Sequence, residues 1–201
     1  MLKRGLRTAL ALLLTAPAVG CISTVVDESF PALGERRAPI QRVAVARMVT
    51  RPEAAIPAAP LIARELAEAL VARGVEVVMP DAAGDAGTAL GAAGLRELAD
   101  RLHRELGVDA VLVGEITRWV EREGGAAGSQ RPASVGMHVE LYGAPDAQRL
   151  WRGQFDHTQQ ALTENLLLTP QYPGGGTRWL TATEFAQFGA RELAAALPLT
   201  P

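Results

Sequence analysis

The sequence predicts an α/β fold in which helices pack on a mixed sheet, with elements in the order β-α-β-α-β-β-β-α. Three observations support this. Short β-branched runs alternate with segments whose apolar residues recur every three or four positions, as in amphipathic helices. Two later segments alternate strictly between apolar and polar residues, which is typical of half-buried strands. A capping signal marks a final helix near the carboxyl end.

The domain opens with a strand, a helix and a second strand. We expect a short buried strand over 42–49, where Val43 and Val45 are apolar. Residues 61–72 carry an apolar stripe at helical spacing, and Arg73-Gly74 ends that helix. The β-branched run at 75–79, ended by proline, predicts the second strand.

An alanine- and glycine-rich segment, 81–94, is interpreted as a linker, because its glycines lack the spacing of a phosphate-binding loop. A second helix is expected over 95–106, with leucines on one face and Gly107 as its stop. Residues 108–113 are nearly all apolar, which predicts a strand covered on both faces and continuing to Val120. Two β-α-β crossovers imply three parallel strands.

An antiparallel hairpin follows a loop at 124–133. Val135, Met137, Val139 and Leu141 alternate with polar residues, and so do Trp151, Gly153 and Phe155 after the turn at 143–146. The segment 161–180 is irregular and rich in proline and glycine. The last helix begins with a capping box, in which Thr181 caps and Glu184 reaches back, and it ends at Pro198.

The amino terminus has the parts of a secretory signal peptide, 1–20: three basic residues, a short apolar core and small residues before Cys21. The core is too short for a membrane-spanning helix. Ala18-Val19-Gly20-Cys21 resembles the lipobox of bacterial lipoproteins. The resemblance implies lipid on Cys21 as the membrane anchor. Ile22, where enteric inner-membrane lipoproteins carry aspartate, points to the periplasmic face of the outer membrane.

Residues 21–40 are interpreted as a lipidated tether, and 41–198 as a single domain. The tether contains prolines, a glycine and charged residues without sustained periodicity. Its nineteen residues after Cys21 could span about 60 Å at full stretch.

Composition argues against several functions. Removing the signal peptide also removes Lys3, Arg4 and Arg7, so 17 basic and 22 acidic residues give a formal charge of 17 − 22 = −5. No basic stripe is present, so we expect no nucleic-acid binding. Lys3 is the sole lysine, which leaves no Schiff-base or Walker lysine. Cys21 is the sole cysteine, so no disulfide forms within the chain.

No catalytic, cofactor-binding or metal-binding residue is expected, and the chain is not expected to be an enzyme. His103, His138 and His157 are far apart and lack metal-ligand spacing. Asp156 and His157 are strand neighbours, so they point to opposite faces. Asp109 and Glu115 lie about 20 Å apart along a strand, too far for joint acid–base work.

One polar surface is a candidate site. If the hairpin pairs as expected, His138, Glu140, Arg152 and Gln154 gather on one sheet face. They form either a hydrated face or a docking surface for a protein partner. Trp119, Trp151 and Trp179 are candidate interface anchors, although we expect at least two of them inside the core.

The element order behind a lipobox resembles a group of periplasmic α/β modules: the amino-terminal domain of TolB, the curli-secretion lipoprotein CsgG and the lipoprotein activators of peptidoglycan synthases. Residues 107–114 (GVDAVLVG) are similar to the central strand of such modules, and the likeness covers about 41–160. Segments 151–160 and 178–182 also look like parts of uncharacterised envelope lipoproteins. No site residues follow from either resemblance.

The resulting hypothesis is a lipid-anchored, non-enzymatic envelope adaptor or assembly factor with a membrane contact through Cys21 and an envelope protein partner. An alternative is a small-molecule or glycan-binding lipoprotein, with 161–180 as a lid and a pocket lined by Trp179, Tyr172 and the polar sheet face. A hydrolase of unrecognised type is a further alternative. A secretion pore subunit is another, but the strand at 115–122 lacks the continuous apolar face that a membrane-crossing strand needs.

Overall fold

The computed structural model describes residues 26–29, 39–46, 48–79, 91–161 and 171–199. The predicted signal peptide, Cys21 and most of the 81–94 linker lie outside the described residues. The elements are β1 (Asp27–Ser29), β2 (Arg42–Val45), β3 (Val49–Thr50), the 3₁₀ helix η1 (Glu53–Ala58), α1 (Ala59–Ala72), β4 (Glu76–Val78), α2 (Ala92–Leu106), β5 (Ala110–Val120), β6 (Glu123–Gly124), β7 (Ser129–Arg131), β8 (Ser134–Gly143), β9 (Arg149–Thr158) and α3 (Ala182–Ala196).

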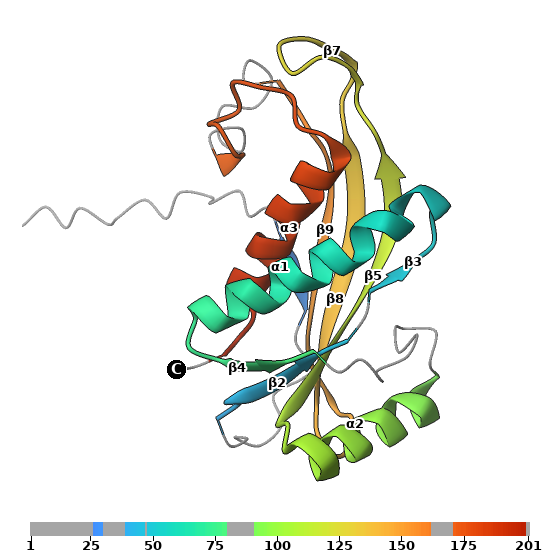
Figure 1. Ribbon diagram of the computed structural model, residues 1–201, viewed down its shortest axis with the longest axis vertical. Coiled ribbons are helices and arrows are strands. Elements are labelled where there is room, and N and C mark those ends of the chain that lie inside the picture. The colour runs from blue at the N-terminus through green and yellow to red at the C-terminus, as the bar shows by residue number, and fades with distance from the viewer. Residues whose placement is uncertain (1–25, 30–38, 47, 80–90, 162–170, 200–201) are drawn as a thin grey trace, which may run out of the picture.

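The main sheet is mixed, with strand order β1-β9-β8-β5-β2-β4 and with β3 beside β5 (Figure 1). Strand β2 pairs in parallel with both β4 and β5, as the two crossovers predict. Strands β5, β8 and β9 pair antiparallel, which confirms the hairpin. The predicted α/β class and mixed sheet are therefore confirmed.

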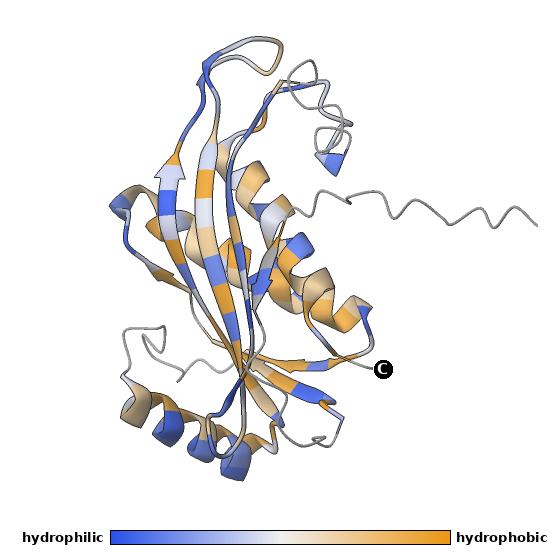
Figure 2. Cartoon of the chain, turned by 180° about the vertical axis from the view of Figure 1, so that it is seen from behind, coloured by the Kyte–Doolittle hydropathy of each residue, from blue (hydrophilic) through white to orange (hydrophobic). Residues whose placement is uncertain are grey.

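Helices cover the two faces of the sheet unequally. Helices α1 and α3 lie together across one face, whereas α2 lies at the lower end of the other (Figure 1). Seen from behind, the upper parts of β5, β8 and β9 carry no described helix (Figure 2). The alternating side chains explain this: one face of β8 and β9 is apolar and buried under α1 and α3, and the other is polar.

Two apolar clusters form the core. The larger lies between the sheet and the α1–α3 layer and includes Ile62, Leu141, Trp151 and Phe185. The smaller lies under α2, where the leucines of that helix meet Val111 and Val113. Because β5 is covered on both faces over its first half, its apolar run is continuous there, as predicted.

The final helix begins as the sequence predicts. The Glu184 backbone N–H donates to Thr181 Oγ1 at 3.1 Å, and the Thr181 N–H donates to the Glu184 carboxylate at 2.9 Å. This reciprocal pair satisfies two N–H groups that a helix start leaves unpaired. Helix α2 ends at Gly107, which has the left-handed φ of 63° that favours glycine at this position.

Strand β1 lies inside the segment that we expected to be a tether without regular structure. Asp27–Ser29 pairs antiparallel with residues 152–154 of β9. Val26 is buried in the main core, and the Trp151 indole Nε1–H donates to the Glu28 carboxylate at 3.0 Å. An edge strand this short is held by backbone bonds to its neighbour, so it needs no periodicity of its own.

Three smaller differences concern boundaries. The predicted loop at 124–133 contains the β6–β7 pair. Helix α2 begins at Ala92, so the end of the predicted linker is helical. The strand expected at 42–49 is divided into β2 and β3. Two- and three-residue elements leave no periodic signal for a sequence pattern to detect.

Candidate functional site

The β8–β9 register brings the four predicted polar residues together. His138 lies opposite Gln154, and Glu140 lies opposite Arg152. The expected gathering on one sheet face is confirmed, while its role as a partner surface stays a prediction. Four further residues share this surface through the same registers and contacts. We call the polar sheet face the set formed by Arg51, Glu115, His138, Glu140, Tyr142, Arg149, Arg152 and Gln154.

Glu140 is the centre of the lower part of this face. Its carboxylate is buried, and it accepts a hydrogen bond from the Tyr142 hydroxyl at 2.7 Å. Arg149 Nη1 lies 3.3 Å from the other carboxylate oxygen, and Arg152 Nη1 lies 3.7 Å from it. A buried carboxylate without such partners would be strongly disfavoured. The cluster is therefore held in one arrangement by its own charges.

Tyr142 serves this cluster as a hydrogen-bond donor. Burial, together with the hydrogen bond to Glu140 and the charge of Glu140, raises the pKa of Tyr142 to about 12. The hydroxyl therefore stays protonated throughout the physiological range.

Glu115 and His138 form the next part of the face. Glu115, on β5, lies opposite His138 on β8, and the Glu115 carboxylate is 3.3 Å from His138 Nε2. Arg51, just after β3, forms an ion pair with the same carboxylate. Burial, followed by the positive charge of Arg152, lowers the pKa of His138, although Glu115 and Glu140 oppose this. His138 is therefore neutral at neutral pH.

The lowered pKa of His138 predicts a loss of stability in acid. An unfolded histidine takes up a proton as the pH falls through about 6.5, whereas folded His138 resists protonation. The unfolded state thus binds more protons, and His138 reduces stability from about pH 6.5 downwards. Urea unfolding at pH 7.5 and 5.5 should show a smaller acid-induced loss for His138→Gln than for the native chain. An acid-induced loss in His138→Gln as large as that of the native chain would contradict this prediction.

Two buried tyrosines make a matched test of the hydrogen bonding. The Tyr172 hydroxyl is buried and has no hydrogen-bond partner among the described residues, unlike that of Tyr142. Tyr172→Phe should therefore raise the free energy of unfolding by about 1 kcal/mol, because a desolvated hydroxyl is removed. Tyr142→Phe should lower it by about 1.5–3 kcal/mol, because a bond to a charged group is lost. Denaturation midpoints that fall equally in both variants would contradict this assignment.

The remaining candidates have structural partners. Asp109 accepts from the backbone N–H groups of Gln41 and Arg42, at 2.9 and 2.8 Å. Asp156 forms an ion pair with Arg118, whereas the His157 ring packs on Phe155 with 4.9 Å between centroids. Asp156 and His157 therefore point to opposite faces, as predicted. His103 is exposed on α2, and its Nδ1 lies 2.8 Å from the Val108 carbonyl oxygen.

The three tryptophans are buried to different degrees. Trp151 is fully buried, while Trp119 is half-buried and packs against the main core. Trp179 is half-buried near the start of α3. Of the two or more tryptophans expected inside, Trp151 lies within the core, and Trp119 packs against it while remaining partly exposed.

The ligand pocket considered from the sequence is not formed by its expected residues. Tyr172 packs edge-to-face on Phe185 and Phe188 of α3, with ring centroids 5.4 and 5.5 Å away. That cluster lies on the apolar side of the sheet, so the sheet separates Tyr172 from the polar sheet face. Residues 162–170 of the predicted lid, 161–180, lie outside the described residues.

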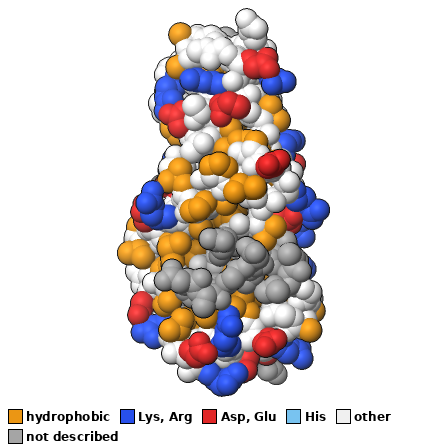
Figure 3. Space-filling model, turned by 45° about the vertical axis from the view of Figure 1, so that its right-hand side comes forward, with side chains coloured by type: hydrophobic (Ala, Val, Ile, Leu, Met, Phe, Trp, Pro, Cys, Tyr) orange, Lys and Arg blue, Asp and Glu red, His pale blue; other side chains and the backbone are white. Residues whose placement is uncertain are grey.

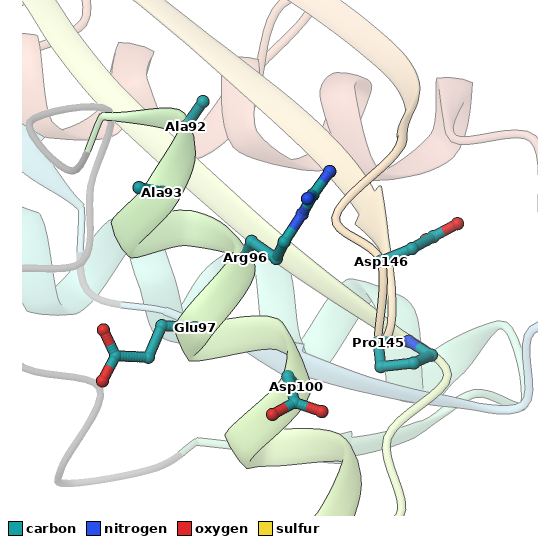
Figure 4. A pocket seen from close by; sticks show the side chains of 7 residues that line it. All are labelled: Ala92, Ala93, Arg96, Glu97, Asp100, Pro145 and Asp146. Atoms are coloured by element: carbon teal, nitrogen blue, oxygen red, sulfur yellow. The ribbon is translucent and has the colours of Figure 1, made fainter.

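Two pockets border the β8–β9 turn instead. One, of about 710 Å³, lies between α2 and Pro145-Asp146, with Arg96 extending from the helix toward the strands and Glu97 pointing away (Figure 4). The other, of about 460 Å³, lies between the same turn and Pro39-Ile40. Four charged residues, Arg96, Glu97, Asp100 and Asp146, help to line the larger pocket, and Asp109 and Asp146 help to line the smaller one.

Within the described ranges, no cluster of three or more histidine, cysteine or acidic side chains is arranged to hold a metal ion. No helix among those residues combines the length and apolar character needed to cross a membrane. Basic and acidic side chains are interspersed on the side seen in Figure 3, and apolar side chains gather across its middle.

The fold is similar to solved structures, although no protein family and no curated protein matches the chain. The PelC dodecamer from Paraburkholderia phytofirmans has a TM-score of 0.57 and 19% identity, covering 88% of this chain and 98% of that chain. A second PelC dodecamer structure has a TM-score of 0.52 and 19% identity, with 84% and 93% coverage. Lipoprotein GNA1162 from Neisseria meningitidis has a TM-score of 0.42 and 18% identity, with 62% and 84% coverage. The chain thus shares the PelC fold, and solved bacterial lipoproteins are among its structural neighbours.

Proposed function

We propose that the chain is an accessory lipoprotein of the bacterial envelope, which is anchored by lipid on Cys21 and acts by binding another protein rather than by catalysis. The polar sheet face carries this proposal. Its upper part lies on strands without a described helix over them, while Tyr142 in its lower part packs against the α2 cluster. Its charged groups are fixed by one another. A rigid, charged surface of this kind suits recognition, because little order is lost when a partner binds.

The chemistry of the face favours binding over catalysis. Glu115 and His138 are close enough for acid–base work, but Arg51 also holds the Glu115 carboxylate. Glu140 is engaged by Tyr142 and two arginines. The Ser134 hydroxyl is hydrogen-bonded to that of Thr158 at 2.8 Å, on the outer rows of β8 and β9. The described carboxylates of this face are therefore committed to structural pairs.

The membrane and the side on which the protein works belong to the same proposal. The lipobox supports a lipid anchor, and Ile22 supports the periplasmic face of the outer membrane. A second candidate function is a homo-oligomeric scaffold. It is favoured by the likeness to PelC, whose solved structure is a dodecamer.

In-cell crosslinking tests the proposal. Native protein and a Cys21→Ala variant are crosslinked in living cells, purified, and compared by mass spectrometry. A discrete envelope protein that is captured only with the native anchor supports the adaptor. Capture of the chain with itself alone, at a defined multiple of its mass, supports the scaffold instead. Recovery of the uncrosslinked chain would refute both.

A further inference from the structure

The polar sheet face presents arginines outward and hides its acidic groups. The Arg51 side chain is 70% exposed, whereas that of its partner Glu115 is 4% exposed. Arg149 and Arg152 are 46% and 39% exposed, and the Glu140 they share is 8% exposed. Glu115 and Glu140 are therefore buried beneath more exposed arginines, whereas Arg118 and its partner Asp156 are both 40% exposed.

The four arginines belong to successive rows of the sheet, with register shifts between the first and second rows and between the third and fourth. Successive rows across the sheet pair Tyr142 with Arg149, Glu140 with Arg152, His138 with Gln154, and Gly136 with Asp156. Arg149 and Arg152 occupy the first two rows. Arg51 belongs to the third row because it forms an ion pair with Glu115, which lies opposite His138. Arg118 belongs to the fourth row because it forms an ion pair with Asp156. We call Arg51, Arg118, Arg149 and Arg152 the arginine stripe. Rows two residues apart are separated by about 6.8 Å.

The charge of this surface is opposite in sign to that of the chain. The four arginines meet three carboxylates, Glu115, Glu140 and Asp156, so the local sum is 4 − 3 = +1 with His138 neutral. The whole chain carries a formal charge of −2. The stripe is thus a local site for an anionic partner on a protein that otherwise repels one.

We propose that the arginine stripe binds an extended acidic segment of a partner protein. This rests on the proposed function and names the chemistry of its partner. In an extended chain, side chains on one side recur about every 6.8 Å, which matches the spacing of the second and third rows, where the pairing is regular. Guanidinium groups also pair with carboxylates through two parallel hydrogen bonds, a geometry that a lysine cannot offer. A flat sheet surface suits an extended segment better than a compact ligand, which needs a concave site.

A peptide titration tests the inference. Full-length lipidated protein in detergent micelles is titrated against a fluorescent decaglutamate peptide, with decaglutamine as the uncharged control. Binding should be specific for decaglutamate and should weaken steeply as salt is raised. Arg149→Gln/Arg152→Gln should weaken it by at least about tenfold. The matched control is Arg64→Gln/Arg104→Gln, at exposed helix positions, and it should leave the affinity unchanged.

Two additions keep the result interpretable. Because the double variant removes partners of buried Glu140, Arg118→Gln is tested as well, since its partner Asp156 is 40% exposed and is not left as a buried, unpaired carboxylate. Circular dichroism confirms folding of each variant. Equal binding by both double variants, or no binding of decaglutamate, would overturn the inference. Tighter binding of polygalacturonate than of decaglutamate, with the same dependence on the stripe, would overturn it in favour of an anionic glycan. A partner still captured in cells after either result would leave the proposed function standing.

Discussion

Trp151→Ala is expected to lower the free energy of unfolding by about 3–5 kcal/mol, the range for truncating a buried aromatic residue to alanine. Trp151 is fully buried between the sheet and α3. Its ring occupies the space beside Gly153, where a Cβ atom would overlap the indole and approach Leu193 within 2.9 Å. Truncation would leave a large cavity and would also remove the indole donor to Glu28. Urea unfolding followed by far-ultraviolet circular dichroism measures the loss.

Trp179→Ala is the matched control for this prediction. Trp179 is half-buried, and its hydrogen bonds to Ala126 and Arg122 use backbone atoms that the substitution keeps. Its loss of stability should therefore be clearly smaller. Similar losses in the two variants would show that Trp151 is not the packing centre of the hairpin.

Gly189→Val is the second substitution expected to have a large effect, with a loss of about 1–3 kcal/mol or more from overpacking. Gly189 lies where α3 crosses β8 and β9, and a Cβ atom there would be 2.7 Å from both Met137 and Phe155. The Phe155 ring is itself fixed by edge contacts with Phe185 and Phe188, at 5.2 and 6.1 Å. It therefore has little room to move. Replacing a helical glycine normally gains up to about 1 kcal/mol, which is too little to offset the overlap.

Ala195→Val separates packing from helix propensity. Ala195 is exposed on the same helix, so valine costs only its lower propensity, about 0.6 kcal/mol. Thermal unfolding should give Gly189→Val a clearly lower melting temperature than Ala195→Val. A Gly189→Val protein as stable as the control would mean that α3 can shift away from the sheet at no cost.

The elements with strong periodicity were predictable from sequence. The capping box at Thr181 and the alternation in β8 each have one dominant physical cause, and the structure confirms both. Strand β1 was not predictable, because it is stabilised by β9 and by the contact between Glu28 and Trp151. Such stabilisation depends on a neighbour more than a hundred residues away in the chain.

The candidate site was predictable only in part. The alternation of apolar and polar residues predicted that His138 and Glu140 share one sheet face, and the hairpin turn predicted that Arg152 and Gln154 lie beside them. Glu115 and Arg51 come from other strands, and their place depends on the register between β5 and β8, which no local pattern fixes. From the sequence, Glu115 was considered as a catalytic partner only of Asp109, and that pair was rejected because about 20 Å separates the two residues along an extended chain. The structure pairs Glu115 across the sheet.

Under the proposed anchoring through Cys21, strand β1 also limits how far the protein can work from the membrane. With lipid on Cys21 and Asp27 fixed in the sheet, six residue steps connect the anchor to the fold, a reach of about 20 Å. The full tether expected from sequence would reach about 60 Å. The accessible volume scales with the cube of the reach, so a threefold shorter reach makes that volume about 27-fold smaller. The effective concentration of the domain toward a partner in the same membrane rises by a similar factor. Three residues of edge strand therefore favour encounters with membrane-bound partners over freely diffusing ones.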